Sequence, residues 1–308
     1  MFIVNLAKKF NKRHNTKMWL KTLLGASRFN VLLSLFFEAT GVKKKEQKYI
    51  SKNKNLKNIY SGKRCFILGN GPSVKKKDIS KLKDEIVFTV NQFSNTEQFQ
   101  IIKPKFHLWA DERFFSLKEN NEGDMEILKD MLKASDKNSS TIVFYKIEAN
   151  ELIRKFKLDK KLRVYYYSDK LVFDETYKKA VDISSQIPWY PTVVQYAIFF
   201  AIYMGIKEIY LLGCECSGIL NFIKEKDSQS SITEYAYSYN VNNKEQKNFQ
   251  EAMEKRTSKA EFEGHFKVFQ YYEWIKKYCD ERKVKLYNCT PGGLLDSIPR
   301  IDFEKIVR

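Results

Sequence analysis

The chain contains few potential metal ligands and no long hydrophobic run, and both absences exclude classes of protein. Only three histidines occur in 308 residues, and no Asp-x-Asp motif is present. Clustered carboxylates are the usual ligands of hard divalent cations, so we expect neither a resident metal nor a bound cofactor. No stretch approaches the ~20 apolar residues of a membrane-spanning helix. The N-terminus lacks the pattern of a secretory signal, so we expect a cytoplasmic protein.

The cysteines are also too few and too irregular for a disulfide framework. There are five, an odd number, at positions 65, 214, 216, 279 and 289. Three lie in apolar, strand-like surroundings, which is typical of reduced thiols. Cys214 and Cys216 form a single C-x-C with no second pair, so zinc is not expected.

Basic charge is concentrated at one end of the chain. Of the net charge of +18, residues 1–64 carry +14, from 16 Lys/Arg and two acidic residues. We expect residues 1–42 to form a basic, amphipathic helical arm that binds the anionic inner-membrane surface. A helical hairpin packed on the body is the alternative, and a nucleic-acid partner is disfavoured. The apolar positions of the arm are Trp19, Leu20, Leu23, Leu24, Val31, Leu32, Leu35 and Phe36.

The rest of the chain predicts an α/β fold with a Rossmann-like, mostly parallel sheet. Residues 43–64 are polar and predict a linker. Residues 65–308 predict a nucleotide-sugar-binding α/β domain. Helices are expected at 192–204 and 264–282. The polar segment 217–259 is expected to be a lid over the site. Strands are expected at 65–68, 86–90, 106–110, 141–144, 164–167, 208–213 and 285–288.

A glycine loop follows the first predicted strand. The sequence Gly69-Asn70-Gly71-Pro72-Ser73 ends an apolar run. Two glycines allow a sharp turn and a close approach to a ligand, and Asn70 offers a donor and an acceptor. Pro72 and Ser73 suit the start of a helix, whose free N–H groups favour an anion. An ordinary strand-to-helix turn is the competing interpretation.

The three histidines differ in their surroundings. His14 lies in the basic arm and is expected at the surface, and His107 lies in a strand pattern typical of a core histidine. His265 follows the polar segment and precedes a helical pattern, a position from which a side chain can face a cleft. It is our candidate general base, because imidazole titrates near neutral pH. Asn91 ends a strand beside Gln92 and predicts either a ligand contact or a turn cap.

Five blocks of sequence, in order, resemble the bacterial CMP-sialic-acid-dependent sialyltransferases of glycosyltransferase family 42. They cover residues 65 to about 296. The wider superfamily includes flagellin-modifying glycosylation proteins and a pterin diphosphokinase. The blocks are Gly69-Asn-Gly-Pro-Ser73, Val90-Asn-Gln-Phe93, Met204-Gly-Ile-Lys-Glu-Ile-Tyr-Leu-Leu-Gly213, Gly264-His265 and Lys285-Leu-Tyr-Asn-Cys-Thr-Pro291.

The resemblance implies roles for individual residues. His265 would take the proton of the acceptor hydroxyl. The donor would be held by Gly69, Asn70, Gly71, Pro72, Ser73, Asn91, Gln92, Asp111, Thr192 and Gly213. Tyrosines of the lid grip the donor phosphate in that family, and this lid contains Tyr235, Tyr237 and Tyr239.

The chain also departs from the family pattern around the donor pocket. Val193-Val194 replaces the family's Ser-Gly after Thr192, and Trp189-Tyr190-Pro191 stands where the family has an arginine. Near Asp111 the family has a donor-binding amide, and a carboxylate there would repel an acidic sugar unless it faces away.

We therefore predict a metal-independent glycosyltransferase, peripheral on the inner membrane. It would move a sialic-acid-like sugar from a CMP-activated donor to a lipooligosaccharide or other glycan acceptor. A CMP donor leaves as a monophosphate, which hydroxyl and amide groups can stabilise without metal. Two alternatives stay open, a diphosphokinase of the same superfamily and a non-catalytic scaffold in glycan assembly. A homo-oligomer is also left open.

Overall fold

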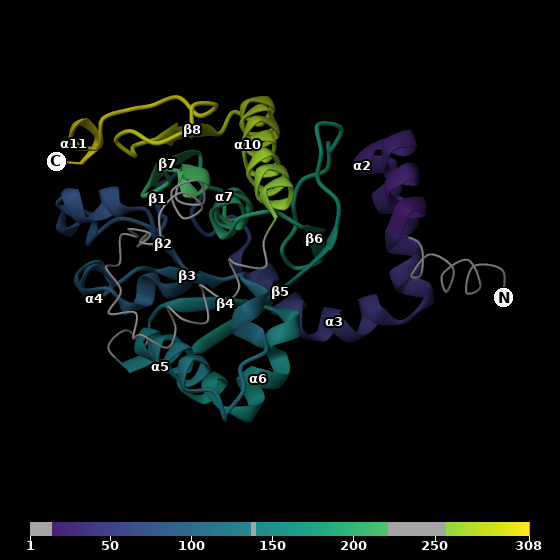
Figure 1. Ribbon diagram of the computed structural model, residues 1–308, viewed down its shortest axis with the longest axis horizontal. Coiled ribbons are helices and arrows are strands. Elements are labelled where there is room, and N and C mark those ends of the chain that lie inside the picture. Colours follow the sequence, from purple (N-terminus) through teal and green to yellow (C-terminus); the bar gives the residue numbers. More distant parts are fainter. Residues whose placement is uncertain (1–13, 137–139, 221–256, 308) are drawn as a thin grey trace.

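The computed structural model describes residues 14–136, 140–220 and 257–307 (Figure 1). Within these residues eight parallel strands form one sheet in the order β6-β5-β4-β3-β2-β1-β7-β8. This confirms the predicted Rossmann-like α/β class. The strands are β1 Arg64–Leu68, β2 Val87–Val90, β3 Phe106–Trp109, β4 Ile142–Lys146, β5 Arg163–Leu171, β6 Gln186–Pro188, β7 Glu208–Leu212 and β8 Lys285–Asn288.

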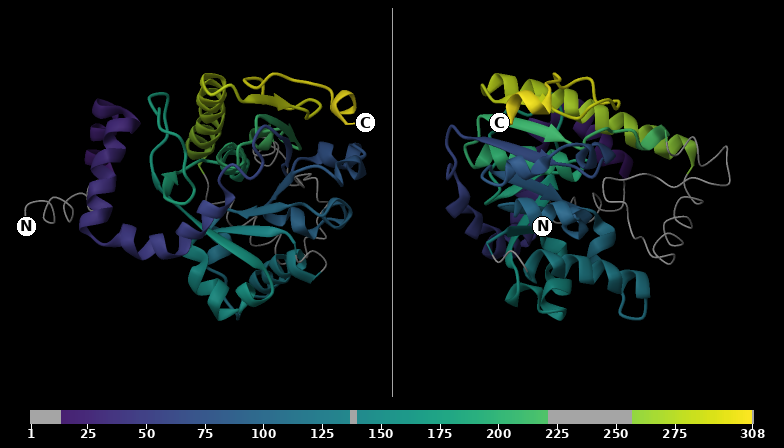
Figure 2. Two further views of the ribbon diagram at one scale, coloured as in Figure 1. Left: turned by 180° about the vertical axis from the view of Figure 1, so that it is seen from behind. Right: turned by 90° about the vertical axis from the view of Figure 1, so that its left-hand side faces the viewer.

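Helices cover both faces of this sheet, as a parallel sheet requires (Figures 1 and 2). One face packs on α7 and α10 and the other on α4, α5, α6 and α11, and each interface has its own apolar cluster. The described helices are α2 His14–Ala39, α3 Val42–Ile50, α4 Glu97–Ile102, α5 Glu122–Asp136, α6 Asn150–Lys155, α7 Val193–Tyr203, α10 Ser258–Glu281 and α11 Phe303–Ile306.

Helix α7 is the centre of the larger apolar cluster. Nine of its 11 residues are buried. A helix that is apolar on nearly all sides must be buried, so the sequence predicted this element within one residue at each end. Phe200 packs edge-on against Phe144 of β4 and Tyr167 of β5, which fixes the helix across the middle of the sheet.

Four features differ from the sequence prediction. Strand β6 was not expected, and β5 is longer than expected because its second half pairs with β6 at Ser168 and Leu171. Helix α10 begins at Ser258, six residues before the predicted start, because the Thr257 side chain caps the Ala260 N–H. Residues 43–64, expected to be a linker, instead contain α3 and a 3₁₀ helix over Ser51–Leu56.

Helix α2 packs on the loop between β5 and β6. The Ala26 N–H donates to Asp174 at 2.9 Å, and the Asn30 side chain both accepts from and donates to the Val172 backbone at 2.8 Å. Ala26 and Phe29 are buried, whereas other apolar residues, before and after a break in the helix at Gly25 (φ 67°), face outward. The described part of the predicted arm is therefore docked on the body. Those outward-facing residues are Leu23, Val31, Leu32 and Leu35.

Candidate functional site

The strand order reverses between β1 and β7, and the loops that follow these two strands are joined by hydrogen bonds. The Gly69 N–H donates to the Leu212 carbonyl and the Gly71 N–H to the Gly213 carbonyl, both at 2.8 Å. Ligands of parallel α/β sheets bind outside the carboxyl ends of the strands at such a reversal. The glycine loop predicted from the sequence therefore lies at the expected position for a ligand site.

Glycine is required in this loop because the chain approaches itself closely. A Cβ atom at Gly69 would lie 2.4 Å from the Gly213 carbonyl oxygen. One at Gly71 would lie 1.4 Å from Glu215 Oε2 and 2.7 Å from the same carbonyl oxygen. The group that approaches the Gly71 backbone is thus the chain's own carboxylate.

Glu215 is the residue of this site that the sequence analysis missed. Its side chain is buried, and Oε1 accepts a hydrogen bond of 2.7 Å from the Ser73 N–H. Of the N–H groups at the start of the predicted helix, that of Ser73 is therefore already taken by Glu215. Pro72 does begin a helix, but it is a 3₁₀ helix of five residues, Pro72–Lys76. An acidic residue three positions after the end of a buried strand was the signal available in the sequence.

Three buried acceptor atoms in these loops have no hydrogen-bond partner among the described residues. They are Glu215 Oε2, Asn70 Oδ1 and Ser73 Oγ. Buried polar atoms are normally paired, and unpaired ones mark places that a ligand or water satisfies. The Glu215 and Asn70 oxygens can only accept hydrogen bonds, whereas the Ser73 hydroxyl can both donate and accept. The loops therefore suit a ligand that carries hydroxyl or amino donors.

Asn91 and Asp111 extend the site to the ends of β2 and β3. Asn91 adopts a left-handed backbone with φ 46°, and its Oδ1 accepts from the Ala110 N–H at 3.2 Å. Asp111 forms an ion pair of 3.2 Å with Arg113, whose guanidinium also donates to Gln92 Oε1 at 3.3 Å. The carboxylate that we expected to repel an acidic sugar is therefore neutralised by its neighbour.

A buried ion pair lies further along the same edge. Lys146, at the end of β4, is 3.0 Å from Asp169 of β5, and their side chains are 5% and 6% exposed. The Tyr196 hydroxyl of α7 donates to the same carboxylate. Burial raises the pKa of Asp169, and the charge of Lys146 opposes that shift. The network ties α7 to the sheet close to Thr192, whose N–H donates to Gln195 Oε1 at 3.3 Å.

His265 lies in the third turn of α10 and faces the segment that follows β7. A Cβ atom at Gly218 would lie 2.9 Å from His265 Cε1, so the ring packs directly on that backbone. Nε2 is 3.8 Å from Glu261 Oε2 on the same face of the helix. The imidazole is 24% exposed, so it is reachable from solvent and not a buried core histidine. At 3.8 Å the carboxylate is close enough for an electrostatic interaction with the imidazole but further than a hydrogen bond.

His107, by contrast, is the core histidine that the sequence predicted. It is fully buried, and its Nδ1 shares a hydrogen bond of 2.8 Å with the Thr89 hydroxyl. Burial lowers its pKa from 6.5 to about 3. It is therefore neutral at physiological pH.

The structure thus places most of the predicted donor-site residues at one edge of the sheet. Tyr235, Tyr237 and Tyr239 lie outside the described residues, as does most of the predicted lid. Within the described ranges, no three His, Cys, Asp or Glu side chains are arranged to hold a metal ion. Among the same residues, no helix has the length and apolar character needed to cross a membrane. The residues at that edge are Gly69, Asn70, Gly71, Pro72, Ser73, Asn91, Gln92, Asp111 and Gly213, with Thr192 at the start of α7.

Comparisons with known proteins give one family and a distant structural neighbour. The family model described as 6-hydroxymethylpterin diphosphokinase MptE-like matches residues 43–219, more than half of the chain. Among solved structures, the chain is similar to the sialyltransferase CstII from Campylobacter jejuni, solved with a substrate analogue, cytidine-5′-monophosphate. That similarity has 19% identity and a TM-score of 0.37, and it covers 77% of this chain and 84% of the other. No curated protein matches this chain.

Proposed function

Because this chain belongs to the MptE-like family, we propose that it is a transferase whose activated donor is a nucleotide bound at the reversal between β1 and β7. The observation that carries this proposal is the set of unpaired buried acceptors, Glu215 Oε2, Asn70 Oδ1 and Ser73 Oγ. Ribose hydroxyls and the amino group of a base are donors that would satisfy them. A donor phosphate would be held elsewhere, since Glu215 occupies the Ser73 N–H.

The transferred group in this proposal is a sialic-acid-like sugar from a CMP-activated donor. The five sequence blocks that resemble glycosyltransferase family 42 support it, and so does the Glu261–His265 pair beside Gly218. His265 would remove the proton of an acceptor hydroxyl of a lipooligosaccharide or other glycan. The acceptor oxygen then bonds to the anomeric carbon as the bond from that carbon to the CMP phosphate oxygen breaks. The leaving phosphate keeps the electron pair.

A panel of nucleotides tests the donor class. Full-length protein is heated with CMP, UDP, GDP or ATP, and a ligand that binds only the folded state raises the melting temperature. CMP should give the largest shift, and Glu215→Gln should reduce it. The Gln side chain keeps an oxygen for the Ser73 N–H, so the fold should be retained. A CMP shift that is absent, or unchanged in Glu215→Gln, contradicts the proposed site.

The family description favours a second candidate, transfer of diphosphate from ATP to an alcohol such as a hydroxymethylpterin. The two candidates release different products, CMP from a CMP-sugar and AMP from ATP. Turnover of each donor with and without a chelator separates them. The glycosyltransferase proposal expects CMP release that survives excess EDTA. Release of AMP that requires added Mg²⁺ would favour the diphosphokinase.

We further propose that α2 holds the protein on an anionic membrane surface on the cytoplasmic side. Leu23 and Leu35 are 63% and 57% exposed on a helix docked through Asn30, within the segment that carries most of the net positive charge. A double variant, Leu23→Ser and Leu35→Ser, should release the protein from anionic vesicles. Both substitutions are at exposed positions and leave the docking contacts of Ala26 and Asn30 intact, so the body should stay folded. Unchanged sedimentation with vesicles would contradict the proposal.

A further inference from the structure

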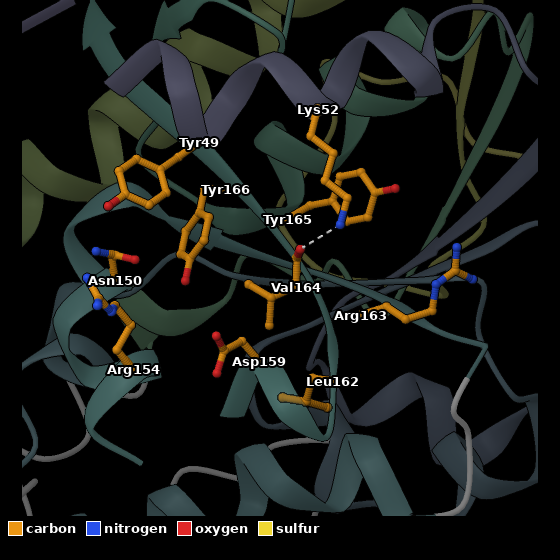
Figure 3. Close-up of a pocket in the computed structure, with 10 residues that line it drawn as sticks. All are labelled: Tyr49, Lys52, Asn150, Arg154, Asp159, Leu162, Arg163, Val164, Tyr165 and Tyr166. Atoms are coloured by element: carbon orange, nitrogen blue, oxygen red, sulfur yellow. Dashed lines mark hydrogen bonds between the residues drawn. The ribbon is translucent and has the colours of Figure 1, made fainter. Parts of the chain in front are cut away.

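A hollow lies beside the amino-terminal half of β5, away from the carboxyl ends of β1 and β7 where the proposed donor site lies. Its volume is about 590 Å³, within the range of small-molecule sites. Strand β6 pairs with β5 only at Ser168 and Leu171, so among the described residues the first half of β5 has no neighbouring strand on that side. The Asn53 side chain instead donates to the Tyr166 carbonyl at 2.7 Å. Helix α3 and the Ser51–Leu56 turn border the hollow on one side. Helix α6 borders it on the other (Figure 3).

One end of the hollow is cationic. Lys52 Nζ lies 4.0 Å from the centre of the Tyr165 ring and donates to the Val164 carbonyl at 3.4 Å (Figure 3). Its pKa is lowered, first by burial and then by the positive charge of Arg163. Throughout the described part of the chain, no carboxylate forms a salt bridge with either cation. An anion bound between them would remove their mutual repulsion.

The other end of the hollow combines aromatic rings with hydroxyl-binding groups. The Tyr49 and Tyr166 rings meet edge to face with centroids 5.7 Å apart. Burial, followed by the nearby Asp159 and Tyr49, raises the pKa of Tyr166 to about 12, so its hydroxyl is a donor at neutral pH. Asn150, Arg154 and Asp159 surround these rings (Figure 3). Aromatic faces with amide, guanidinium and carboxylate groups suit a ring that carries several hydroxyls.

From these two ends we propose that the hollow is a binding site for a sugar phosphate, distinct from the donor site. The phosphate lies between Lys52 and Arg163. The sugar ring packs on Tyr166, with its hydroxyls toward Asn150, Arg154 and Asp159. Asp159, which a phosphate alone would avoid, is explained as an acceptor for sugar hydroxyls. The same chemistry occurs in a free sugar phosphate and in the headgroup of an inositol phospholipid.

Calorimetric titration of the full-length protein tests the site, with glucose 1-phosphate, inorganic phosphate and glucose as probes. Glucose 1-phosphate should bind at least about tenfold more tightly than either of the other two, because only it fills both ends. A second measurement compares binding of the protein to vesicles that contain phosphatidylinositol with its binding to vesicles that contain phosphatidylglycerol. Binding of glucose 1-phosphate alone assigns a free ligand, and preference for phosphatidylinositol alone assigns a headgroup. The proposal is overturned if the protein neither binds glucose 1-phosphate more tightly than the other two probes nor prefers phosphatidylinositol vesicles.

Variants locate the binding. Arg163→Gln and Arg154→Gln should each weaken it by about tenfold, the loss expected for one charge-assisted contact. Arg154 is exposed and makes no salt bridge among the described residues, so its variant should fold even if Arg163→Gln does not. Lys160→Gln removes an equal charge from the neighbouring surface and should change affinity less than twofold. Equal losses in Lys160→Gln would show general electrostatic attraction and overturn the site.

Asn70→Ala separates this hollow from the donor site. Glucose 1-phosphate binding should be unchanged in Asn70→Ala. Asn70 follows the carboxyl end of β1, whereas the hollow lies beside the amino-terminal half of β5. Loss of binding in that variant would place the probe in the donor site and overturn the proposal. The result does not depend on whether the protein is a glycosyltransferase.

Discussion

Glu215 and Ser73 are 142 positions apart in sequence and are joined by a hydrogen bond of 2.7 Å from the Ser73 N–H to the Glu215 carboxylate. The bond ties the loop after β7 to the loop after β1. It also explains why Gly71 cannot carry a side chain, since the second carboxylate oxygen occupies that space. The site is thus built by contact between two strand ends, and four predictions test this architecture.

Gly71→Ala should destabilise the protein by about 1–3 kcal/mol, the usual cost of forcing a group into a packed site. The added methyl group would displace Glu215 and approach the Gly213 carbonyl. Gly264→Ala is the matched control, because that helical position has open space around it. It should stabilise α10 by about 0.5–1 kcal/mol. Urea denaturation measures both changes, and equal effects would contradict the packing described here.

His265→Ala should reduce transfer by about 10²–10⁴, the contribution of a positioned general base. Nucleotide affinity should stay close to wild type, whereas Asn70→Ala should weaken it. Glu261→Gln should lower the rate less, since it only removes the partner of the imidazole. Initial rates across pH should show a rising limb in wild type that is absent in His265→Ala. Wild-type turnover by His265→Ala would leave this residue a structural role only.

Acid should destabilise the protein through His107. The folded pKa is about 3, below the ordinary value of 6.5, so between these values only the unfolded chain binds the proton. Stability therefore falls as pH drops below ~6.5, by about 2 kcal/mol at pH 5 from this residue.

Urea denaturation at pH 7 and pH 5 measures this loss. His107→Asn should lose less stability on acidification than wild type. Thr89→Val, which removes the partner of His107 but keeps the buried imidazole, should retain the full pH dependence. A wild-type pH dependence in His107→Asn would refute the assignment.

Breaking the Lys146–Asp169 pair should be costly. Asp169→Asn would leave a buried ammonium whose other carboxylate, Glu112, lies 3.7 Å away and is 83% exposed. Removing one partner of a buried pair destabilises proteins by about 3–5 kcal/mol. The double variant Asp169→Asn with Lys146→Met should recover part of that loss. Thermal denaturation of both variants gives the comparison, and a double variant less stable than Asp169→Asn would contradict the pairing.

The sequence predicted those parts of the fold that are encoded locally. β1 with its glycine loop, and the uniformly apolar α7, each have a local sequence pattern that is compatible with few other structures. β6 has only three residues, and the second half of β5 contains three consecutive polar residues, Ser168 to Lys170, so neither has a strong local pattern. The start of α10 was missed because the cap at Thr257 follows a polar segment.

The candidate site was predictable only where it lies in one stretch of chain. Gly69 to Ser73 and Asn91 could be recognised because strand ends and turn residues mark them. Glu215 could not, since its importance depends on a contact with Ser73 that exists only in the folded sheet. The same holds for Gly218, which meets His265 across the beginning of α10.

The central position of β1 has a consequence for how the protein folds. β1 pairs with β2, which follows it closely in sequence, and with β7, whose residues 208–212 are synthesised some 140 residues after β1. Until then β1 presents an unpaired apolar edge, and such edges recruit strands from other chains. Pairing between distant segments is also slow. Expression at low temperature or with chaperones should therefore raise the yield of this protein more than any change to its surface.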